Sequence, residues 1–444
     1  MLSRLLASFV VVLCWTAQAQ QPTDPPAISP PVSAQLPAAP ESRAEALADK
    51  ASLPLTLPEA LALAEKNSPR LHAANARTAR AAAGIHTAKA YTNPQVEYFG
   101  GHQDSRDPTV PGLAGAIQHY AAYQTMEIPG ERKARKRVAT LGQTSSEFSL
   151  ANERLVVVAD VKRAFYDVLR RKQEITHAQE NLSLVEDLRR RVEVEVRVGE
   201  KGRLELTRAE AELARARFMV RSAQIGLADS IAVLRVAIAA PADMNLNPQG
   251  TLDPETRLEP LPQLREAILR THPAMQQART DVQGAEAGLQ YQRSLRTPRP
   301  VFYGEYERYP DVFYWRAGVT IPIPLWDRRR GPIQEAAASV RESTASLDQR
   351  QLEMISALER AYEQYQLADQ QVTSLQAGSL REAESAVDAA QAAYHFGERG
   401  IVEVLDAQRV LQSVRADLLD AQYARQSALT DLEELGAVTP GGRP

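Results

Sequence analysis

Apolar residues recur three and four positions apart over two long stretches, at about 131–198 and 331–396, that are rich in Ala, Leu, Glu, Arg and Gln. The clearest helical runs of apolar residues are Leu182, Val185, Leu188 and Val192, and also Leu411, Val414, Leu418 and Ala421. Such spacing places the apolar residues on one narrow helix face. A helix of this length extends over roughly 100 Å and buries little surface alone, so we expect it to bundle with other helices.

Four other segments, at about 95–104, 117–128, 300–309 and 313–323, are rich in aromatic and β-branched residues and predict strands. In the last of them the apolar residues occupy alternate positions, namely Phe313, Trp315, Ala317, Val319 and Ile321. A strand with that alternation has one apolar and one polar face, as strands of membrane barrels have.

The chain contains the same unit twice. A Leu-Pro pair at 57–58 recurs 204 residues later at 261–262, and the eight residues from Gly199 match the eight from Gly397. Each half reads helix, two strands, long helix, glycine break and helix, with Pro94 and Pro298 stopping the first helices. The expected parts are a first repeat at 54–240, a linker at 241–258, a second repeat at 259–437 and a tail at 438–444.

The first nineteen residues are typical of a secretory signal peptide. A positive start is followed by the apolar run 5–15, and Ala17-Gln18-Ala19 is a small-x-small cleavage pattern. Residues 20–53 are rich in Pro, Ala and Ser and predict an extended tether. No later stretch has the ~18 uncharged apolar residues of a membrane-spanning helix, so any span is expected to be built from strands.

Charge and composition exclude several classes of function. Lys and Arg number 52 against 55 Asp and Glu, which argues against a nucleic-acid partner. The single cysteine, Cys14, lies in the signal peptide, so thiol chemistry is not expected in the mature chain. The seven histidines lack metal-ligand spacing, and no catalytic set or nucleotide motif occurs. We therefore predict no enzyme activity, no cofactor and no bound metal.

Two further patterns have both a structural and a functional interpretation. Gly199, Gly202, Gly397 and Gly400 break the long helices at equivalent places, either as ordinary turns or as functional tips of two helical hairpins. Basic runs at 132–137 and 328–330 follow the strand pairs, either as solvated helix starts or as contacts with anionic lipid headgroups. Trp315 and Trp326 flank the same region and suit a membrane interface.

With these features, the sequence resembles the outer-membrane factor family typified by TolC over nearly all of the mature chain. The resemblance rests on the duplicated halves, the opening LTLPEALALAEKNSPRL, the strand exits MEIPGERKARKRVA and VTIPIPLWDRRRGPIQEA, and the stretch YHFGERGIVEVLDAQRVLQSVRADLLDAQ. The exits resemble most the heavy-metal (CzcC-like) branch. The resemblance implies a mainly α fold with a membrane β-barrel: a homotrimer with four strands per protomer in a 12-stranded barrel, joined to a long coiled-coil tunnel across the periplasm.

The resemblance also implies a function and a site. It implies a passive exit duct in the outer membrane of a Gram-negative bacterium, with an RND-type inner-membrane pump and a periplasmic adaptor as partners, for metal cations or small toxic compounds. The adaptor would dock on the four tip glycines. The residues that match the family's periplasmic aperture are Tyr394, Arg399, Glu403, Asp406 and Glu205.

Two other classes of protein were weighed against this interpretation. A periplasmic adaptor or scaffold also uses long helical hairpins, but one hairpin flanked by small β-domains is expected there, whereas this sequence predicts two hairpins. An enzyme or metal carrier would require clustered catalytic groups or ligands. Fractionation distinguishes these classes, because the duct is expected as a detergent-resistant trimer in outer membranes.

Overall fold

The computed structural model describes residues 53–104, 113–252 and 258–438. The predicted signal peptide, the tether up to residue 52 and the tail from residue 439 lie outside these described residues. None of the helices in the described ranges has the length and apolar character needed to cross a membrane.

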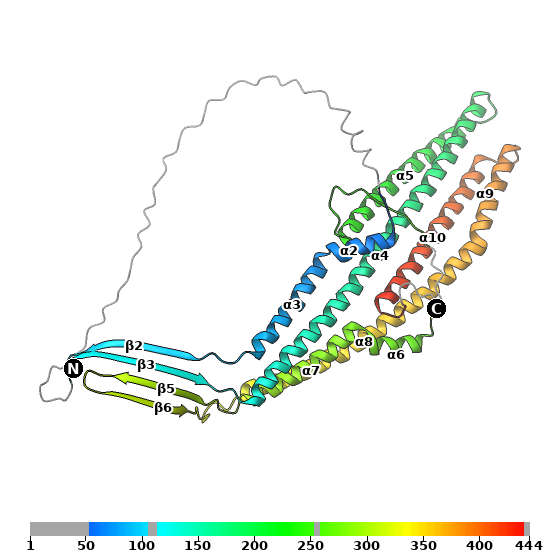
Figure 1. The fold of residues 1–444 in the computed structure, drawn as a ribbon. Helices are drawn as coiled ribbons and strands as arrows, with labels where there is room; N and C mark the ends of the chain where they lie inside the picture. The colour runs from blue at the N-terminus through cyan, green and yellow to red at the C-terminus, as the bar shows by residue number, and fades with distance from the viewer. Residues whose placement is uncertain (1–52, 105–112, 253–257, 439–444) are drawn as a thin grey trace, which may run out of the picture. The chain divides into compact units, whose positions relative to one another are not determined.

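The two halves have the same order of elements (Figure 1). The first half comprises α2 (Leu57–Asn67), α3 (Pro69–Lys89), β2 (Gln95–Gln103), β3 (Gly115–Thr125), α4 (Pro129–Arg197) and α5 (Arg203–Ala237). The second comprises α6 (Leu261–Thr271), α7 (Pro273–Ser294), β5 (Val301–Arg308), β6 (Phe313–Thr320), α8 (Arg330–Ser374), the π-helix η1 (Leu375–Ser379), α9 (Leu380–His395) and α10 (Ile401–Glu434).

The first helix of each half is in fact two helices. Pro69 and Pro273 each begin the second of the pair, and proline disfavours helical geometry in the residue before it. Accordingly Ser68 and His272 are extended, with ψ angles of 118° and 132°. The two breaks lie at equivalent positions and therefore preserve the internal duplication.

The second long helix also differs from the expectation of one helix over 331–396. A single π-helical turn, η1, interrupts it and separates α8 from α9, whereas α4 is continuous over 69 residues. A π-helical turn accommodates an extra residue without ending the helix. Gly378 lies in this turn, where the weak helix propensity of glycine makes the change less costly.

The four strands form one antiparallel sheet in the order β2-β3-β5-β6. Every second residue points to the same face of the sheet, and the register aligns these residues from strand to strand. The apolar residues of the outer face, as named here, include Val96, Tyr98, Tyr120, Ala122, Phe302, Tyr306, Phe313, Trp315, Ala317 and Val319. The inner face comprises Glu97, Phe99, His119, Ala121, Tyr123, Tyr303, Glu305, Glu307, Tyr314 and Arg316.

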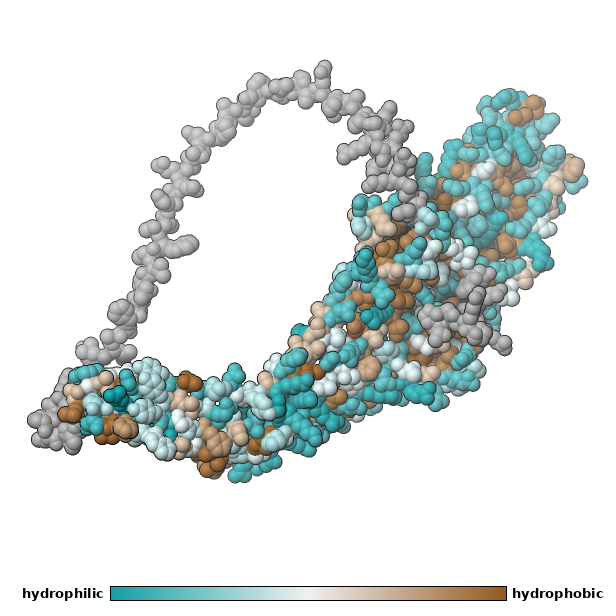
Figure 2. Space-filling model, in the orientation of Figure 1, coloured by the Kyte–Doolittle hydropathy of each residue, from teal (hydrophilic) through white to brown (hydrophobic). Residues whose placement is uncertain are grey.

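The two faces differ in polarity as the alternation in 313–323 predicts. Large apolar side chains of the outer face are exposed, including Trp315 at 76% and Val96 at 81%, and Figure 2 shows hydrophobic residues at the surface of the strands. The three carboxylates of the strands, those of Glu97, Glu305 and Glu307, all lie on the inner face, whereas Arg308 and His102 occupy outer-face positions toward the ends of the strands that are far from the helices. An apolar face of this kind requires an apolar environment or a covering partner.

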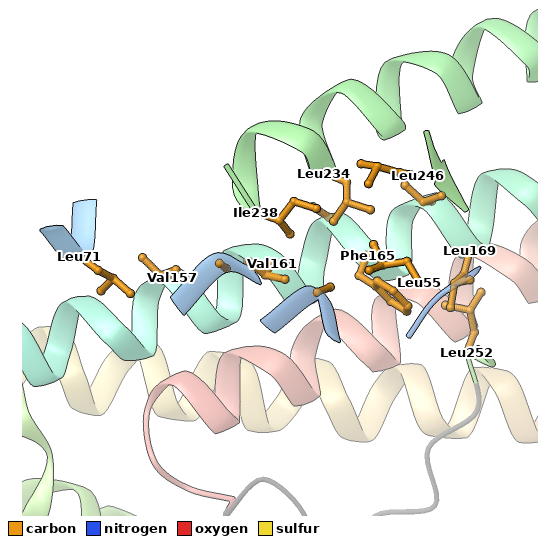
Figure 3. Close-up of a cluster of buried hydrophobic side chains, with 14 of the residues drawn as sticks. Leu55, Leu71, Val157, Val161, Phe165, Leu169, Leu234, Ile238, Leu246 and Leu252 are labelled. Atoms are coloured by element: carbon orange, nitrogen blue, oxygen red, sulfur yellow. The ribbon is translucent and has the colours of Figure 1, made fainter. Parts of the chain in front are cut away.

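The predicted linker is partly structured. The strand β4 (Leu246–Pro248) pairs in parallel with β1 (Leu53–Leu55), which lies at the end of the predicted tether. Leu55, Leu246 and Leu252 are buried in the apolar cluster that Figure 3 shows around Phe165. This cluster joins β1 and β4 to α4 and α5, so the linker contributes to the fold of the first half.

The two halves meet mainly along α4, which packs against α7 and α10, and across the paired strands β3 and β5. Lys162 of α4, which is buried, forms an ion pair with Glu433 of α10. Next to it, Arg163 contacts Asp431 at 2.7 Å and also pairs with Glu434. Breaking one partner of a buried pair leaves an uncompensated charge, so this ionic cluster fixes the relative position of α4 and α10.

Candidate aperture at the hairpin tips

Both helical hairpins reverse through the same backbone motif, and their turns lie at the same end of the helices (Figure 1). Gly199 has φ 86° and Gly397 has φ 73°, a region that glycine adopts without a steric penalty. In each turn the amide of the third residue after the helix donates to the third carbonyl from the helix end: Glu200 N to Glu195 O at 2.9 Å, and Glu398 N to Ala393 O at 3.0 Å. This is the Schellman arrangement, formed twice.

The other two tip glycines have a different role. Gly202 and Gly400 are the N-caps of α5 and α10 and have extended backbones, with φ angles of −80° and −85°. Other residues adopt this conformation freely. Only Gly199 and Gly397 among the four therefore require glycine for the reversal itself.

Tyr394 connects the two hairpins at their tips. Its hydroxyl donates to the carboxylate of Glu195 in α4 at 2.5 Å. The ring is 6% exposed, and the ammonium of Lys201 lies 5.6 Å from its centre. Burial first, and then the hydrogen bond to Glu195 and the negative charges of Glu195 and Glu205, raise the pKa of the Tyr394 hydroxyl well above its ordinary value. The hydroxyl is therefore protonated and acts as a donor.

The packing around this hydrogen bond is apolar and comes from both hairpins. Buried residues of α4, α5, α9 and α10 form one cluster: Leu188, Val192, Ala209, Tyr394, Ile401, Val404 and Leu405. Of the seam predicted in α4, Val185, Leu188 and Val192 are buried as expected. Of the seam predicted in α10, Leu411 and Ala421 are buried as expected, while Leu419 rather than Leu418 is the buried residue between them.

Glu205 lies close to Tyr394 on the first turn of α5. One of its carboxylate oxygens, Oε2, is buried and has no hydrogen-bond partner among the described residues. An unpaired buried oxygen is costly, so this carboxylate favours any change that provides a donor or water. The structure therefore brings together two of the five residues predicted for the aperture, Tyr394 and Glu205.

The other three are not part of this cluster within one chain. Arg399, Glu403 and Asp406 are all exposed, and Asp406 pairs with Arg409 of its own helix at 3.1 Å. Glu403 and Asp406 are three residues apart and thus share one face of α10. The opposite face is the one that packs against the first hairpin.

Sequence reasoning missed Glu195 and Lys201. Glu195 precedes Gly199 by four residues and Tyr394 precedes Gly397 by three, so both lie in the last helical turn before a tip. That shared position is the signal in the sequence. It does not specify which way the side chains point, because this depends on how the two hairpins pack.

Two residues of the first basic run, Arg132 and Arg135, have a structural role. Arg132 donates to the carbonyl of Lys89 at 2.6 and 3.0 Å and lies over the ring of Tyr91. Arg135 donates to the carbonyls of Ala88 and Ala90, at 3.1 and 2.8 Å. These are the last carbonyls of α3, where cations are favourable and unpaired acceptors need donors. The cations at the start of α4 thus stabilise the end of another helix.

Two further predictions concern metal-ligating groups and the tryptophans. Within residues 53–104, 113–252 and 258–438, no group of three or more His, Cys, Asp or Glu is arranged to hold a metal ion. Trp315 is exposed on β6, and Trp326, which follows the same strand, is 92% exposed. Trp315 lies on the outer face of the sheet, toward the end far from the helices. Trp326 lies between the end of β6 and the start of α8.

Comparisons with known proteins lead to the same class of protein as the sequence does. Residues 60–241 and 264–437 match the family described as outer membrane efflux protein. The cobalt-zinc-cadmium resistance protein CzcC of Cupriavidus metallidurans is 24% identical over 87% of this chain and 91% of its own.

Two further similarities extend the comparison. The pyoverdine export outer membrane protein OpmQ of Pseudomonas aeruginosa is 23% identical over 76% of this chain and 72% of its own. The crystal structure of the outer membrane protein VceC of Vibrio cholerae superposes with a TM-score of 0.74 at 16% identity, covering 86% of this chain and 96% of that one.

Proposed function

The chain belongs to the outer membrane efflux protein family, and we propose that it forms the passive exit duct of a tripartite efflux system. As a member of that family it is an outer-membrane channel component that extends into the periplasm. The internal duplication is confirmed by the two matched ranges, one in each half. The family consists of efflux proteins rather than enzymes, and we propose no reaction for the chain.

The duct is a homotrimer in this proposal. The sheet has two edges, β2 and β6, and an exposed apolar outer face. Unpaired backbone groups at a sheet edge are not tolerated in lipid, so the edges must pair with other chains. Three copies of four strands give the 12-stranded closed barrel that the resemblance implies. Outer-membrane lipid then covers the apolar face, with Trp315 and Trp326 near the interface.

The periplasmic end of the duct closes at the hairpin tips. The hydrogen bond from Tyr394 to Glu195 connects the second hairpin to the first within one chain, whereas Arg399, Glu403 and Asp406 are left exposed for neighbouring chains. Threefold symmetry places six carboxylates of Glu403 and Asp406 around one constriction. Carboxylates crowded in this way attract cations, so the closed aperture prefers cations and is blocked by multivalent ones.

The energy for transport comes from elsewhere. A periplasmic adaptor docks on the tips at Gly199, Gly202, Gly397 and Gly400 and favours the open hairpins by contacting them better than the closed ones. An RND-type inner-membrane pump supplies the cargo. The names of CzcC and OpmQ refer to metal ions and to pyoverdine respectively, so the cargo proposed here is a metal cation or a small toxic compound.

The single observation that carries the proposal is the buried hydrogen bond from Tyr394 to Glu195, beside an exposed acidic face of α10. The test records single-channel current in planar bilayers for the double variant Glu403→Ala/Asp406→Ala. We expect weaker cation preference and weaker block by trivalent cations. A control variant, Glu359→Ala/Glu363→Ala, removes two exposed carboxylates of α8 and should behave as wild type. If the cation preference of Glu403→Ala/Asp406→Ala equals that of wild type, these two residues do not form the aperture.

A further inference from the structure

A second group of ionisable side chains lies on the inner face of the sheet, at the opposite end of the duct from the hairpin tips. It comprises His119 of β3, Glu305 and Glu307 of β5, and Tyr314 and Arg316 of β6. Val301 and Thr125 mark the ends of the strands that adjoin the helices, so Glu307 lies near the far ends. We call this group the exit cluster.

The carboxylate of Glu307 is held in place by aromatic hydroxyls. Tyr309 donates to its Oε1 at 3.0 Å, and Tyr314 donates to its Oε2. The side chain is 11% exposed. Two neutral donors orient a carboxylate without cancelling its charge, so Glu307 remains an anionic group with a fixed position.

Glu305 lies two residues further along the same face. Arg316 donates to it at 2.6 Å and lies 3.6 Å from Glu307. Tyr123 also donates to Glu305, at 3.3 Å. One guanidinium therefore faces two carboxylates, and a third, that of Glu97, lies on the same face of β2. The inner face has an excess of negative charge.

His119 provides an observation independent of the acidic groups. The residue is 6% exposed and stacks on Phe99 with 4.4 Å between ring centres. Its Nδ1 is buried without a hydrogen-bond partner in the described part of the chain and lies 4.0 Å from Glu307 Oε1. That distance is too long for a hydrogen bond. A buried nitrogen without a partner thus points at the carboxylate, in a site suited to a bridging polar species.

We propose that the exit cluster is a second cation-binding site of the duct, at its outer end, which takes hydrated multivalent cations through Glu305 and Glu307. The inference rests on the proposed function, because a closed threefold barrel turns this face inward and brings three copies of the cluster to one lumen. Binding is electrostatic, through the water shell of the cation, in keeping with the lack of a three-ligand metal group in the described residues. The duct then prefers cations at both ends, independently.

The experiment compares the block of the channel when a blocker is added to one or the other side of the membrane. Hexaamminecobalt(III), which keeps its ammine shell, is added to either side of single trimers in planar bilayers. When the blocker is added on the side of the strands, the blocking concentration for Glu305→Gln/Glu307→Gln should be at least roughly tenfold higher than for wild type. Removing anionic charges near a trivalent ion weakens its binding by an amount of this order. On the side of the hairpin tips, the blocking concentration should stay as in wild type. The matched control is Asp311→Asn, which removes a carboxylate from the exposed turn between β5 and β6.

The outcomes separate the two proposals. Block from the side of the strands that is unchanged in the double variant would overturn the exit cluster and leave the duct intact. Absence of any channel in wild-type protein would instead overturn the proposed function. If the double variant does not assemble, Glu97→Gln tests the same idea on an exposed side chain. It should weaken block from that side only, and no change would refute the cluster.

Discussion

Replacing Tyr394 by Phe is the most direct test of the joint between the hairpin tips. The hydroxyl donates to Glu195, and the ring is buried in an apolar cluster with residues of α4, α5 and α10. Phenylalanine keeps the ring and its packing. The substitution therefore removes the hydrogen bond and little else.

The expected effect follows from the charge of the acceptor. A hydrogen bond to a charged group contributes about 1.5–3 kcal/mol, and Glu195 loses its tyrosine donor in the variant. If the bond is present in the closed state and absent from the open one, the closed state loses this free energy in each subunit. At about 1.4 kcal/mol per tenfold change, the ratio of open to closed hairpins rises by roughly 10-fold to 100-fold per subunit.

Single-channel recording measures this ratio directly. Tyr394→Phe should open more often or to larger conductance than wild type. A control is Tyr166→Phe, which makes the same chemical change at a half-buried tyrosine of α4 beside Phe165, and which should leave the channel closed. A double-mutant cycle with Glu195→Gln then separates the pair from its surroundings.

Two results would refute the reasoning. One is an open probability of Tyr394→Phe equal to that of wild type. The other is strict additivity of the Tyr394→Phe and Glu195→Gln effects, because residues that share a hydrogen bond should show a coupling energy.

Three further predictions concern stability, measured by thermal or denaturant unfolding of the detergent-solubilised protein. Gly199→Ala should cost about 1–2 kcal/mol because of its positive φ, while Gly202→Ala, extended and equally open, should cost little. Arg135→Met should cost about 3 kcal/mol, since it removes the donor to the carbonyls of Ala88 and Ala90 and the charged partner of the buried carboxylate of Glu127, whereas the exposed neighbour Lys136→Met should be nearly neutral. Burial lowers the pKa of His272 below its ordinary 6.5, so the unfolded chain binds the proton more readily; the contribution of His272 to stability should be constant above pH 6.5 and fall below it, and His272→Asn should remove that contribution.

The spacing of apolar residues predicted which segments are helices and which are strands, because the two faces of each element contact different surroundings. The outer face of β6 was readable in advance from Phe313, Trp315 and Val319, since a membrane-facing strand must be apolar at alternate residues. The long helices were readable from seams such as Val185 and Leu188. These features depend on local spacing, which the sequence states directly.

The breaks within the helices were missed for a local reason. Pro69 suits the first turn of a helix, so the apolar spacing continues across it while the backbone of Ser68 departs from helical geometry. The π-turn at Leu375–Ser379 likewise leaves composition unchanged. Partners such as Glu195 for Tyr394 were missed because they depend on how two distant hairpins pack.

The distribution of polar contacts along α4 and α10 supports the proposed opening of the duct at the hairpin tips. Near the middle of α4 and the C-terminal end of α10, the buried pair of Lys162 and Glu433 and the adjoining contacts of Arg163 join the two helices through charged groups, and separating them would leave unpaired charges in a poorly solvated site. At the tips, a small apolar cluster and the hydrogen bond of Tyr394 join the hairpins, and Glu205 has an oxygen without a partner. The free energy needed to part the helices is therefore lowest at the tips. In the proposed duct, the adaptor contacts this joint at the tips, while the ionic cluster of Lys162, Arg163 and Glu433 holds α4 and α10 together further along.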